Sequence, residues 1–236
     1  MDLSAFATAG ALLPARSRSP RWRPGLADAR HSEVFSSARE ASGAAAALAL
    51  ALDGLRAGGD AGHAVLWVQD AASLRLTGRP YRAGLPAALR TRLIHVAARS
   101  CQDALFALEE GVRCRELACV IGEIAGNPKA LDMTASRRLS LAAEHHGVPL
   151  FLVRLDAARD LSSARMRWQV RAAPSPPPQW NAQAPGTPAW HAELFRARGH
   201  APGEWILHGE DHELVAIPPD HGDLAAARGD RSLAAV

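Results

Sequence analysis

The chain has 236 residues, of which 48% are hydrophobic, and its 27 basic side chains exceed its 24 acidic ones by a formal charge of +3. This length allows one domain of ordinary size with extensions, and the apolar content is enough to bury a core, which excludes a chain too polar to fold. No run of about 18 uncharged apolar residues occurs, so we expect no membrane span.

The basic side chains are almost all arginine, and Lys129 is the only lysine. An arginine excess with abundant alanine is typical of a GC-rich genome, so arginine alone is weak support for phosphate binding, although selection for positive charge remains an alternative. Cys101, Cys114 and Cys119 form no CxxC pair and lie within or beside apolar runs, which predicts reduced core thiols in the cytoplasm. The N-terminus lacks the basic start of a secretory signal, so we expect no export.

The first elements follow an irregular segment. Residues 1–32, rich in proline, serine and arginine, are interpreted as a disordered basic arm, either a solvated tail or a contact for DNA or a partner. A short strand is expected at residues 33–35. Ser37 and Glu40 then fit a capping box, which predicts a helix from there to about Arg56.

Four apolar runs without alternation predict strands that are buried on both faces, as in parallel sheets covered by helices. They are residues 64–68, 93–96, 117–121 and 150–153. Helices are expected between them, from a cap at Ser100 through Arg113, and over residues 131–146, where Gly147 is the stop. This order of elements predicts a three-layer αβα domain with a mostly parallel central sheet, built from right-handed crossovers, over residues 33–173.

The pattern changes near the end of this domain. Met166, Trp168 and Val170 alternate with polar residues, which predicts a half-exposed, antiparallel strand at a sheet edge. The proline cluster at residues 174–188 is expected to be an extended linker. Short strands over residues 190–197, 204–208 and 213–217 would make a small C-terminal β appendage at residues 189–217, with tryptophans in its core, before a disordered tail at residues 218–236.

The motifs of common nucleotide sites are absent. A phosphate-binding loop needs GxxxxGK[ST], and Lys129 follows Gly126-Asn127-Pro128, which does not match. GxGxxG, GxSxG and HExxH are absent as well. We therefore expect no enzyme activity, no cofactor and no metal site.

A few acidic and histidine side chains could still suggest chemistry. Asp70 and Glu123 follow predicted strands, where α/β proteins place reactive groups, but without a phosphate cradle we interpret them as structural polar ends or remnants. His208 and His212 lie among acids at a predicted turn, and a polar hairpin tip is favoured over a weak metal site.

A series of short motifs in one order resembles the ImuA family of RecA-like mutagenesis proteins over about residues 34–217. The motifs are Leu66-Trp67-Val68-Gln69-Asp70, Gly78-Arg79-Pro80-Tyr81, Leu108-Glu109-Glu110-Gly111, Val120-Ile121-Gly122-Glu123, Leu131-Asp132-Met133-Thr134-Ala135, Arg167-Trp168-Gln169-Val170 and Pro202-Gly203-Glu204-Trp205. The resemblance implies a RecA-like core without its ATP-binding loop.

The resemblance also implies a function: a non-catalytic adaptor in damage-induced translesion synthesis, part of the SOS response. The implied partners are an ImuB-like inactive Y-family polymerase homologue, RecA and an error-prone replicative-type polymerase. Arg137-Arg138-Leu139 resembles a helix motif of the SulA division inhibitors, so a SulA-like inhibitor remains an alternative, as does a degenerate nucleotide-binding switch.

Candidate binding residues follow from the RecA-like fold, in which loops after the later strands face DNA. These loops are residues 124–130 and 156–165, and Arg79 and Tyr81 lie in another loop. Arg137 should point outward from its helix, whereas Arg138 is expected in an ion pair with Glu123 or Asp132. A phosphate-contacting stripe could comprise Arg159, Arg165, Arg167 and Arg171, but charge that protects an edge strand from aggregation explains the same pattern.

Overall fold

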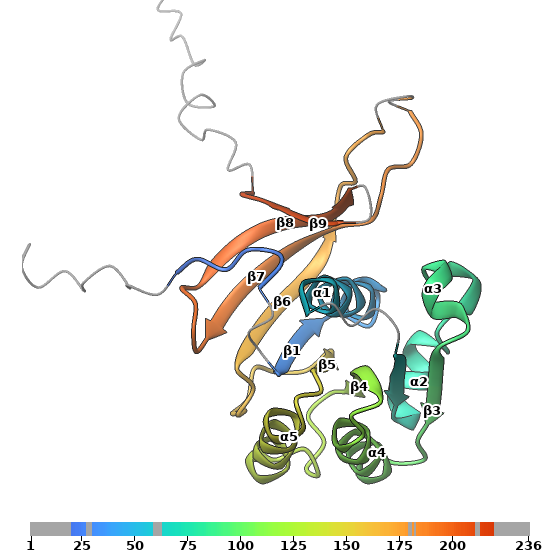
Figure 1. The fold of residues 1–236 in the computed structure, drawn as a ribbon, viewed down its shortest axis with the longest axis vertical. Helices are drawn as coiled ribbons and strands as arrows, with labels where there is room; N and C mark the ends of the chain where they lie inside the picture. The colour runs from blue at the N-terminus through green and yellow to red at the C-terminus, as the bar shows by residue number, and fades with distance from the viewer. Residues whose placement is uncertain are drawn as a thin grey trace, which may run out of the picture.

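The apolar runs of the sequence form parallel strands in the computed structural model, which describes residues 20–26, 30–58, 63–178, 181, 183–210 and 213–219 (Figure 1). The strands in these residues are β1 (His31–Ser36), β2 (Ala64–Gln69), β3 (Leu93–Ala97), β4 (Leu117–Ala125), β5 (Leu150–Leu155), β6 (Met166–Ala173), β7 (Ala189–Ala197), β8 (Gly203–Glu210) and β9 (Glu213–Ile217). The helices are α1 (Ser42–Gly58), α2 (Ala71–Thr77), η3 (Arg82–Gly84), α3 (Ala87–Arg90), α4 (Cys101–Arg113) and α5 (Met133–His146).

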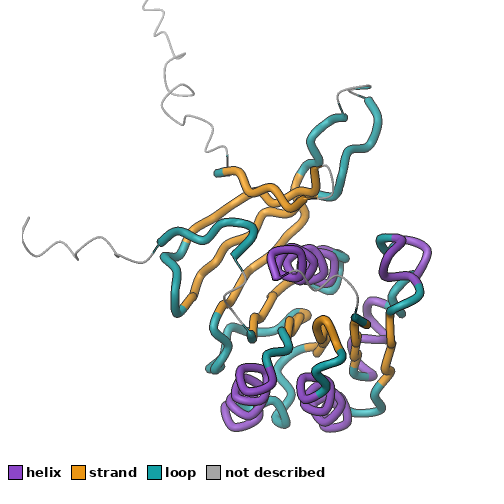
Figure 2. Tube along the Cα trace, viewed as in Figure 1, coloured by secondary structure: helices purple, strands orange, loops and turns teal. Residues whose placement is uncertain are grey.

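All nine strands belong to one sheet, in the order β3-β2-β4-β5-β1-β6-β7-β8-β9. The strands from β3 to β6 pair in parallel, and β6 to β9 pair antiparallel. Helix α1 covers one face of the sheet, whereas α4 and α5 cover the other (Figure 2). The fold is therefore the predicted RecA-like αβα arrangement with additional C-terminal strands.

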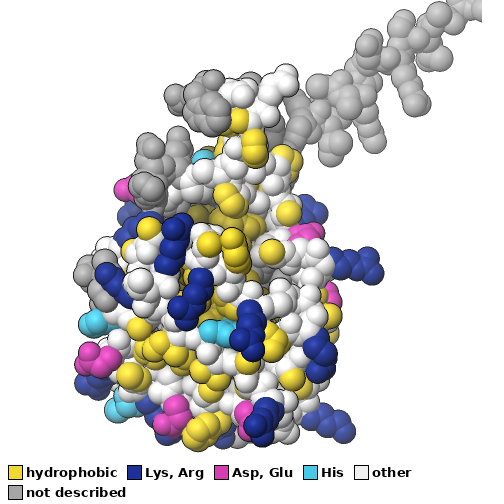
Figure 3. Space-filling model, turned by 90° about the vertical axis from the view of Figure 1, so that its right-hand side faces the viewer, with side chains coloured by type: hydrophobic (Ala, Val, Ile, Leu, Met, Phe, Trp, Pro, Cys, Tyr) yellow, Lys and Arg dark blue, Asp and Glu magenta, His cyan; other side chains and the backbone are white. Residues whose placement is uncertain are grey.

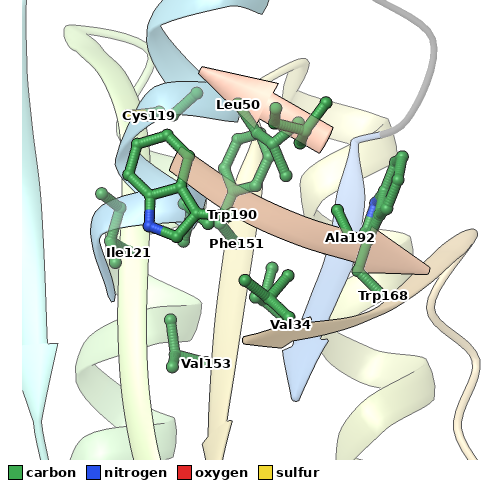
Figure 4. Packing of buried hydrophobic residues seen from close by; sticks show 14 of the residues in the cluster. Val34, Leu50, Cys119, Ile121, Phe151, Val153, Trp168, Trp190 and Ala192 are labelled. Atoms are coloured by element: carbon green, nitrogen blue, oxygen red, sulfur yellow. The ribbon is translucent and has the colours of Figure 1, made fainter. Parts of the chain in front are cut away.

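Alternate side chains of the central strands supply the two cores. Val65 and Trp67 pack toward α1, and Leu66 and Val68 pack toward α4 and α5. Figure 4 shows the α1 side, where Leu50 of the helix meets side chains from β4, β5, β6 and β7. Because both faces of the parallel strands are covered, these strands contain few polar positions.

Local capping explains where the helices begin and end. The Ser100 hydroxyl accepts from the Asp103 N–H (3.1 Å) at the start of α4, as predicted. The Asp132 carboxylate accepts from the Ala135 N–H (2.8 Å) at the start of α5, and Gly147 ends that helix at φ 77°. The predicted capping box of Ser37 is wrong, because its hydroxyl accepts from the Arg39 N–H (3.2 Å) in a turn and α1 starts at Ser42.

Two glycines allow α4 to lie close to the sheet. A Cβ atom at Gly111 would lie 2.4 Å from Leu66 Cδ2, and one at Gly122 would lie 2.8 Å from Leu108 Cδ2. Any larger side chain at either position would have to displace a buried leucine. The distance between α4 and strands β2 and β4 therefore depends on these two residues.

Strand β6 corrects one prediction. It lies inside the sheet, parallel to β1 and antiparallel to β7, and is not an edge strand. The alternation was real, since Met166, Trp168 and Val170 face the α1 core. The other face of the strand is covered at its start, where Arg167 is only 3% exposed, whereas Arg171 farther along is exposed.

The C-terminal strands extend the central sheet and share its core. Trp190 and Trp205 are buried in the cluster that contains Leu50 of α1, so the expected appendage has no separate core. The sheet curves so that the C-terminal strands pass over α1 (Figure 1). The described parts of the proline-rich linker, residues 174–178, 181 and 183–188, contain no helix or strand, and residues 220–236 of the expected tail lie outside the described residues.

Part of the expected N-terminal arm is ordered, which contradicts the prediction of a disordered segment at residues 1–32. Trp22 is buried, and its ring contacts Trp168 (centroids 4.8 Å apart) and Trp205 (5.4 Å) edge to face. Residues 1–19 and 27–29 lie outside the described residues. The segment that contains Trp22 is therefore part of the folded core.

Candidate interaction surface

The turn between β1 and α1 is the position where a P-loop domain holds phosphate. Here the Ala38 N–H donates to Asp156 Oδ1 (3.0 Å), and Glu40 Oε2 accepts from the Ser42 hydroxyl (2.5 Å) and the Ala172 N–H (2.7 Å). The hydrogen bonds from Ser42 and then from Ala172 lower the pKa of Glu40. A carboxylate of the chain itself therefore accepts from the Ala38 N–H of this turn, and the Glu40 carboxylate lies in the same turn.

Two carboxylates at the ends of central strands serve local structure. Asp70 accepts from the Ser73 N–H (2.7 Å) and caps α2. Glu123 accepts from Trp67 Nε1 (2.6 Å) and from the Thr77 hydroxyl (3.0 Å), and burial raises its pKa. This arrangement fits the interpretation of both residues as structural polar ends.

The predicted arginine stripe does not form a continuous surface. Arg167 Nε donates to Glu33 Oε2 (2.7 Å), and both side chains are buried. Arg165 pairs with Glu144, and Arg159 pairs with Glu193 (2.7 Å). Arg159 also lies over the ring of Phe195, with its Cζ atom 3.9 Å from the ring centroid. Of the four arginines, only Arg171 is exposed and has no ion pair among the described residues.

Beneath these arginines lies a buried polar network. Glu33 Oε1 accepts from the Ser162 hydroxyl (2.8 Å) and lies 3.6 Å from Arg154 Nη1, while Asp160 Oδ1 lies 3.5 Å from the same nitrogen. Two buried arginines therefore share one buried carboxylate and one partly exposed carboxylate. The charges of Glu33, Arg154 and Arg167 lie at the contact between β1, β5 and β6 and are shielded from the solvent.

A second buried polar cluster lies under α5. His31 Nδ1 hydrogen-bonds to the Ser140 hydroxyl (2.6 Å), which in turn hydrogen-bonds to the Ser163 hydroxyl (2.6 Å). Burial lowers the pKa of His31 to about 4, so the ring is neutral at pH 7. This histidine holds the start of β1 against α5 and faces no cavity described for the chain.

The remaining predicted residues are exposed. Arg79 and Tyr81 lie between α2 and η3, and Arg137 projects from α5. Arg138 forms an ion pair as expected, but with Glu109 Oε2 (2.5 Å) of α4 and not with Glu123 or Asp132. The structure thus brings Arg79 and Tyr81 to one edge of the sheet and places Arg137 on the helical layer.

The sequence analysis missed Arg82, which lies beside Arg79 and donates from Nη2 to the Leu93 carbonyl (3.0 Å). A signal for this surface was present in the sequence, because no aspartate or glutamate occurs between Asp70 and Asp103. An arginine count alone cannot detect such a segment. The absence of acids narrows the search, although residues 161–192 also lack them and only the structure shows that Arg165 and Arg167 are paired.

The cysteines differ from the prediction of three core thiols. All three are free thiols, but Cys114 is exposed at the end of α4. Burial raises the pKa of Cys119 to about 12 and, as the main cause, that of the half-buried Cys101 to about 11. Only Cys119 is a core thiol in the full sense.

The structure offers cavities but no metal cluster. A cavity of about 310 Å³ between α1 and the start of β4 and β5 is lined by Trp22, Asp53, Arg115 and Phe151 among others. Among the described residues, no group of three or more histidine, cysteine, aspartate or glutamate side chains is placed to hold a metal ion, and Asp211 and His212 of the predicted hairpin tip lie outside them. Nor does any helix in the described ranges have the length and apolar character to cross a bilayer.

The sheet order and the self-capped β1–α1 turn define a RecA-like α/β protein without a phosphate-binding loop. No protein-family model matches the chain. Comparison with curated proteins finds Protein ImuA from two strains of Caulobacter vibrioides, each 36% identical over 187 residues, which cover 72% of this chain and 72% of the relative. The chain belongs to the ImuA family.

Proposed function

We propose that this protein is a non-catalytic adaptor in damage-induced translesion DNA synthesis that binds an ImuB-like inactive Y-family polymerase homologue. Family membership supports the biological setting. The observation that supports the non-catalytic part is the β1–α1 turn, where Asp156 accepts from the Ala38 N–H and Glu40 adds a second carboxylate, so that a phosphate would be repelled. A scaffold of this kind works through its surfaces, and contacts with RecA and an error-prone replicative-type polymerase belong to the same proposal.

The exposed side of α5 is the candidate surface for the polymerase homologue. Met133, Arg137 and Leu141 are spaced four residues apart, so they lie along one side of the helix. Met133 is 46% exposed and Leu141 is 54% exposed, and Phe106 of the neighbouring α4 is 66% exposed. Apolar side chains around an arginine are the composition that protein interfaces favour.

A titration of the purified chain with its cognate ImuB-like partner tests the proposal. Association at micromolar or lower concentration is expected, and Arg137→Glu should weaken it by roughly tenfold or more if the arginine lies at the interface centre. Arg171→Ala, an exposed arginine on β6, is the matched control and should leave the affinity unchanged. Absence of association at micromolar concentration contradicts the adaptor function.

Isothermal titration with ATP and magnesium tests the alternative of a nucleotide switch. We expect a flat trace, because added phosphate would meet two carboxylates at the turn. Measurable heat of ATP binding that is lost when the turn is altered would support the switch and contradict the adaptor.

A SulA-like division inhibitor is a second candidate that one observation favours. Arg137 of the Arg137-Arg138-Leu139 motif is exposed and open to a partner, whereas Arg138 is held by Glu109. Overproduction in undamaged cells distinguishes the two functions: filamentation that Arg137→Glu abolishes would favour the inhibitor, and normal division would favour the adaptor.

A further inference from the structure

One edge of the sheet carries positive charge without acidic neighbours. Although acids nearly balance bases over the whole chain, the segment from Asp70 to Asp103 contains no acid between these two residues. It contains the arginines Arg75, Arg79, Arg82, Arg90, Arg92 and Arg99. This segment forms α2, η3, α3 and β3, so its charge gathers beside the edge strand β3.

Two of these arginines, Arg79 and Arg82, lie close enough to β3 to affect its residues. Arg82 Nη2 donates to the carbonyl of Leu93, the first residue of β3, at 3.0 Å. Burial first, and then the charges of Arg79 and Arg82, lower the pKa of His95 on the same strand. In the described part of the chain no carboxylate pairs with Arg79 or Arg82, so neither guanidinium charge is neutralised by an ion pair among these residues.

An exposed aromatic ring lies between these arginines in the sequence. Tyr81 is the only tyrosine of the chain and is 77% exposed. Its ring rests near η3, since a Cβ atom at Gly84 would lie 3.1 Å from Tyr81 Cδ1. Ile94 on β3 is also 48% exposed. On the face where α2, α3 and β3 lie, basic side chains surround apolar ones (Figure 3).

We propose that Arg79, Tyr81 and Arg82 form a binding surface for single-stranded nucleic acid, with phosphates on the guanidinium groups and a base stacked on the tyrosine ring. Unpaired arginines attract a phosphate backbone, and an exposed ring offers a stacking platform that only an unstacked base can use. An acidic peptide would satisfy the charges but leave the ring without a role. The inference deepens the proposed function, which it assumes, by assigning the adaptor its own contact with the template.

The single tyrosine provides a site-specific probe. The full chain labelled with 3-fluorotyrosine should give one 19F resonance, from position 81, and titration with a 20-nucleotide oligo(dT) should shift or broaden it. Affinity should fall as salt rises, with a slope of about −0.7 in log–log form for each phosphate contact to a single strand. A poly-glutamate peptide and a DNA duplex of equal length are the comparison ligands.

Variants then test the individual side chains by anisotropy of a labelled oligonucleotide. Tyr81→Ala should weaken binding roughly tenfold through lost stacking, and Arg79→Ala with Arg82→Ala should reduce the magnitude of the salt slope by about 1.4. If loss of the Arg82 hydrogen bond to Leu93 unfolds the loop, Arg79→Ala alone tests the same contact with phosphate. This single variant should leave the loop folded, because Arg79 forms no ion pair among the described residues. Arg113→Ala, on α4 and paired with Glu109 and Glu110, is the matched control, and thermal unfolding confirms that each variant is folded.

Several outcomes overturn the inference. A resonance that responds to poly-glutamate but not to oligo(dT) would assign the surface to an acidic protein, and DNA binding unchanged in all three variants would place it elsewhere. Tyr81→Ala should still associate with the ImuB-like partner. For the unmodified chain, absence of oligo(dT) binding while the partner still associates would refute only the nucleic-acid contact. A 19F response to oligo(dT) without association of the partner would refute only the adaptor function.

Discussion

Replacing Arg167 by alanine tests whether the arginines of β6 stabilise the fold or bind phosphate. Arg167 is 3% exposed, and its Nε donates to a buried Glu33 at 2.7 Å. Removal of one partner from a buried ion pair costs about 3–5 kcal/mol, because the remaining charge loses its compensation without gaining water. Arg154 lies 3.6 Å from Glu33 Oε1 and keeps part of that compensation, so we expect the lower end of the range, about 3 kcal/mol.

The assay is thermal unfolding followed by circular dichroism. For a chain of this size 1 kcal/mol lowers Tm by about 2–4 °C, so Arg167→Ala should lower it by about 6–12 °C. Arg171→Ala, four residues along the same strand and exposed, should change stability by no more than about 0.5 kcal/mol. The double variant with Glu33→Gln should lose less than the sum of the two single losses, because the two residues are in contact.

The opposite result would refute the reasoning. If Arg167→Ala unfolds at the same temperature as Arg171→Ala and both lose affinity for oligo(dT), the strand presents a phosphate-binding stripe after all. That result would mean that the buried Glu33 carboxylate can lose its Arg167 partner without any loss in the free energy of unfolding.

Three further predictions concern a histidine, the thiols and a glycine. The pKa of His31 is about 4 in the folded state and about 6.5 in the unfolded state, so its contribution to stability is full above pH 6.5 and should fall by about 3 kcal/mol as the pH drops toward 4. Urea unfolding measures this loss, which should be smaller in His31→Gln and unchanged in His145→Gln. A thiol reagent at pH 7 should modify Cys114 within seconds and Cys119 only on unfolding, which mass spectrometry can follow, and fast labelling of Cys119 would contradict its burial. Gly122→Ala should cost about 1–3 kcal/mol by displacing a leucine of α4, and an unchanged Tm would show that the helix can move away.

The sequence predicted the central elements because their signals are local. Unbroken apolar runs mark strands covered on both sides, and Ser100 and Gly147 mark helix ends through hydrogen bonds within a few residues. Only part of the arrangement at the turn after β1 could be predicted from the sequence. A missing lysine and glycine pattern showed that phosphate has no cradle, but the role of Asp156, which is more than a hundred residues from Ala38, required the fold.

The errors have a common cause, which is contact between distant segments. Trp22 lies in a segment rich in arginine and proline, and nothing nearby predicts that Trp168 and Trp205 enclose it. Likewise, Arg167 follows the alternation of a half-exposed strand, and its burial is compensated by Glu33 on the adjacent β1 and by Asp160. Glu33 lies in β1 beside Val34 and Phe35, and a glutamate in a predicted strand is the sequence signal that a buried partner exists.

The arginine bias of the chain makes carboxylates the better guide to function. Where a glutamate is within reach, as for Arg159, Arg165 and Arg167, the guanidinium group forms an ion pair within the protein. Where the chain omits every acid over a whole edge of the sheet, as around Arg79 and Arg82, the charge is left for a ligand. Residues 161–192 also lack acids, yet Arg165 and Arg167 there pair with Glu144 and Glu33 of other segments. The edge around Arg79 and Arg82 differs because no described carboxylate pairs with these two arginines, so it is the part of the surface where binding should be sought first.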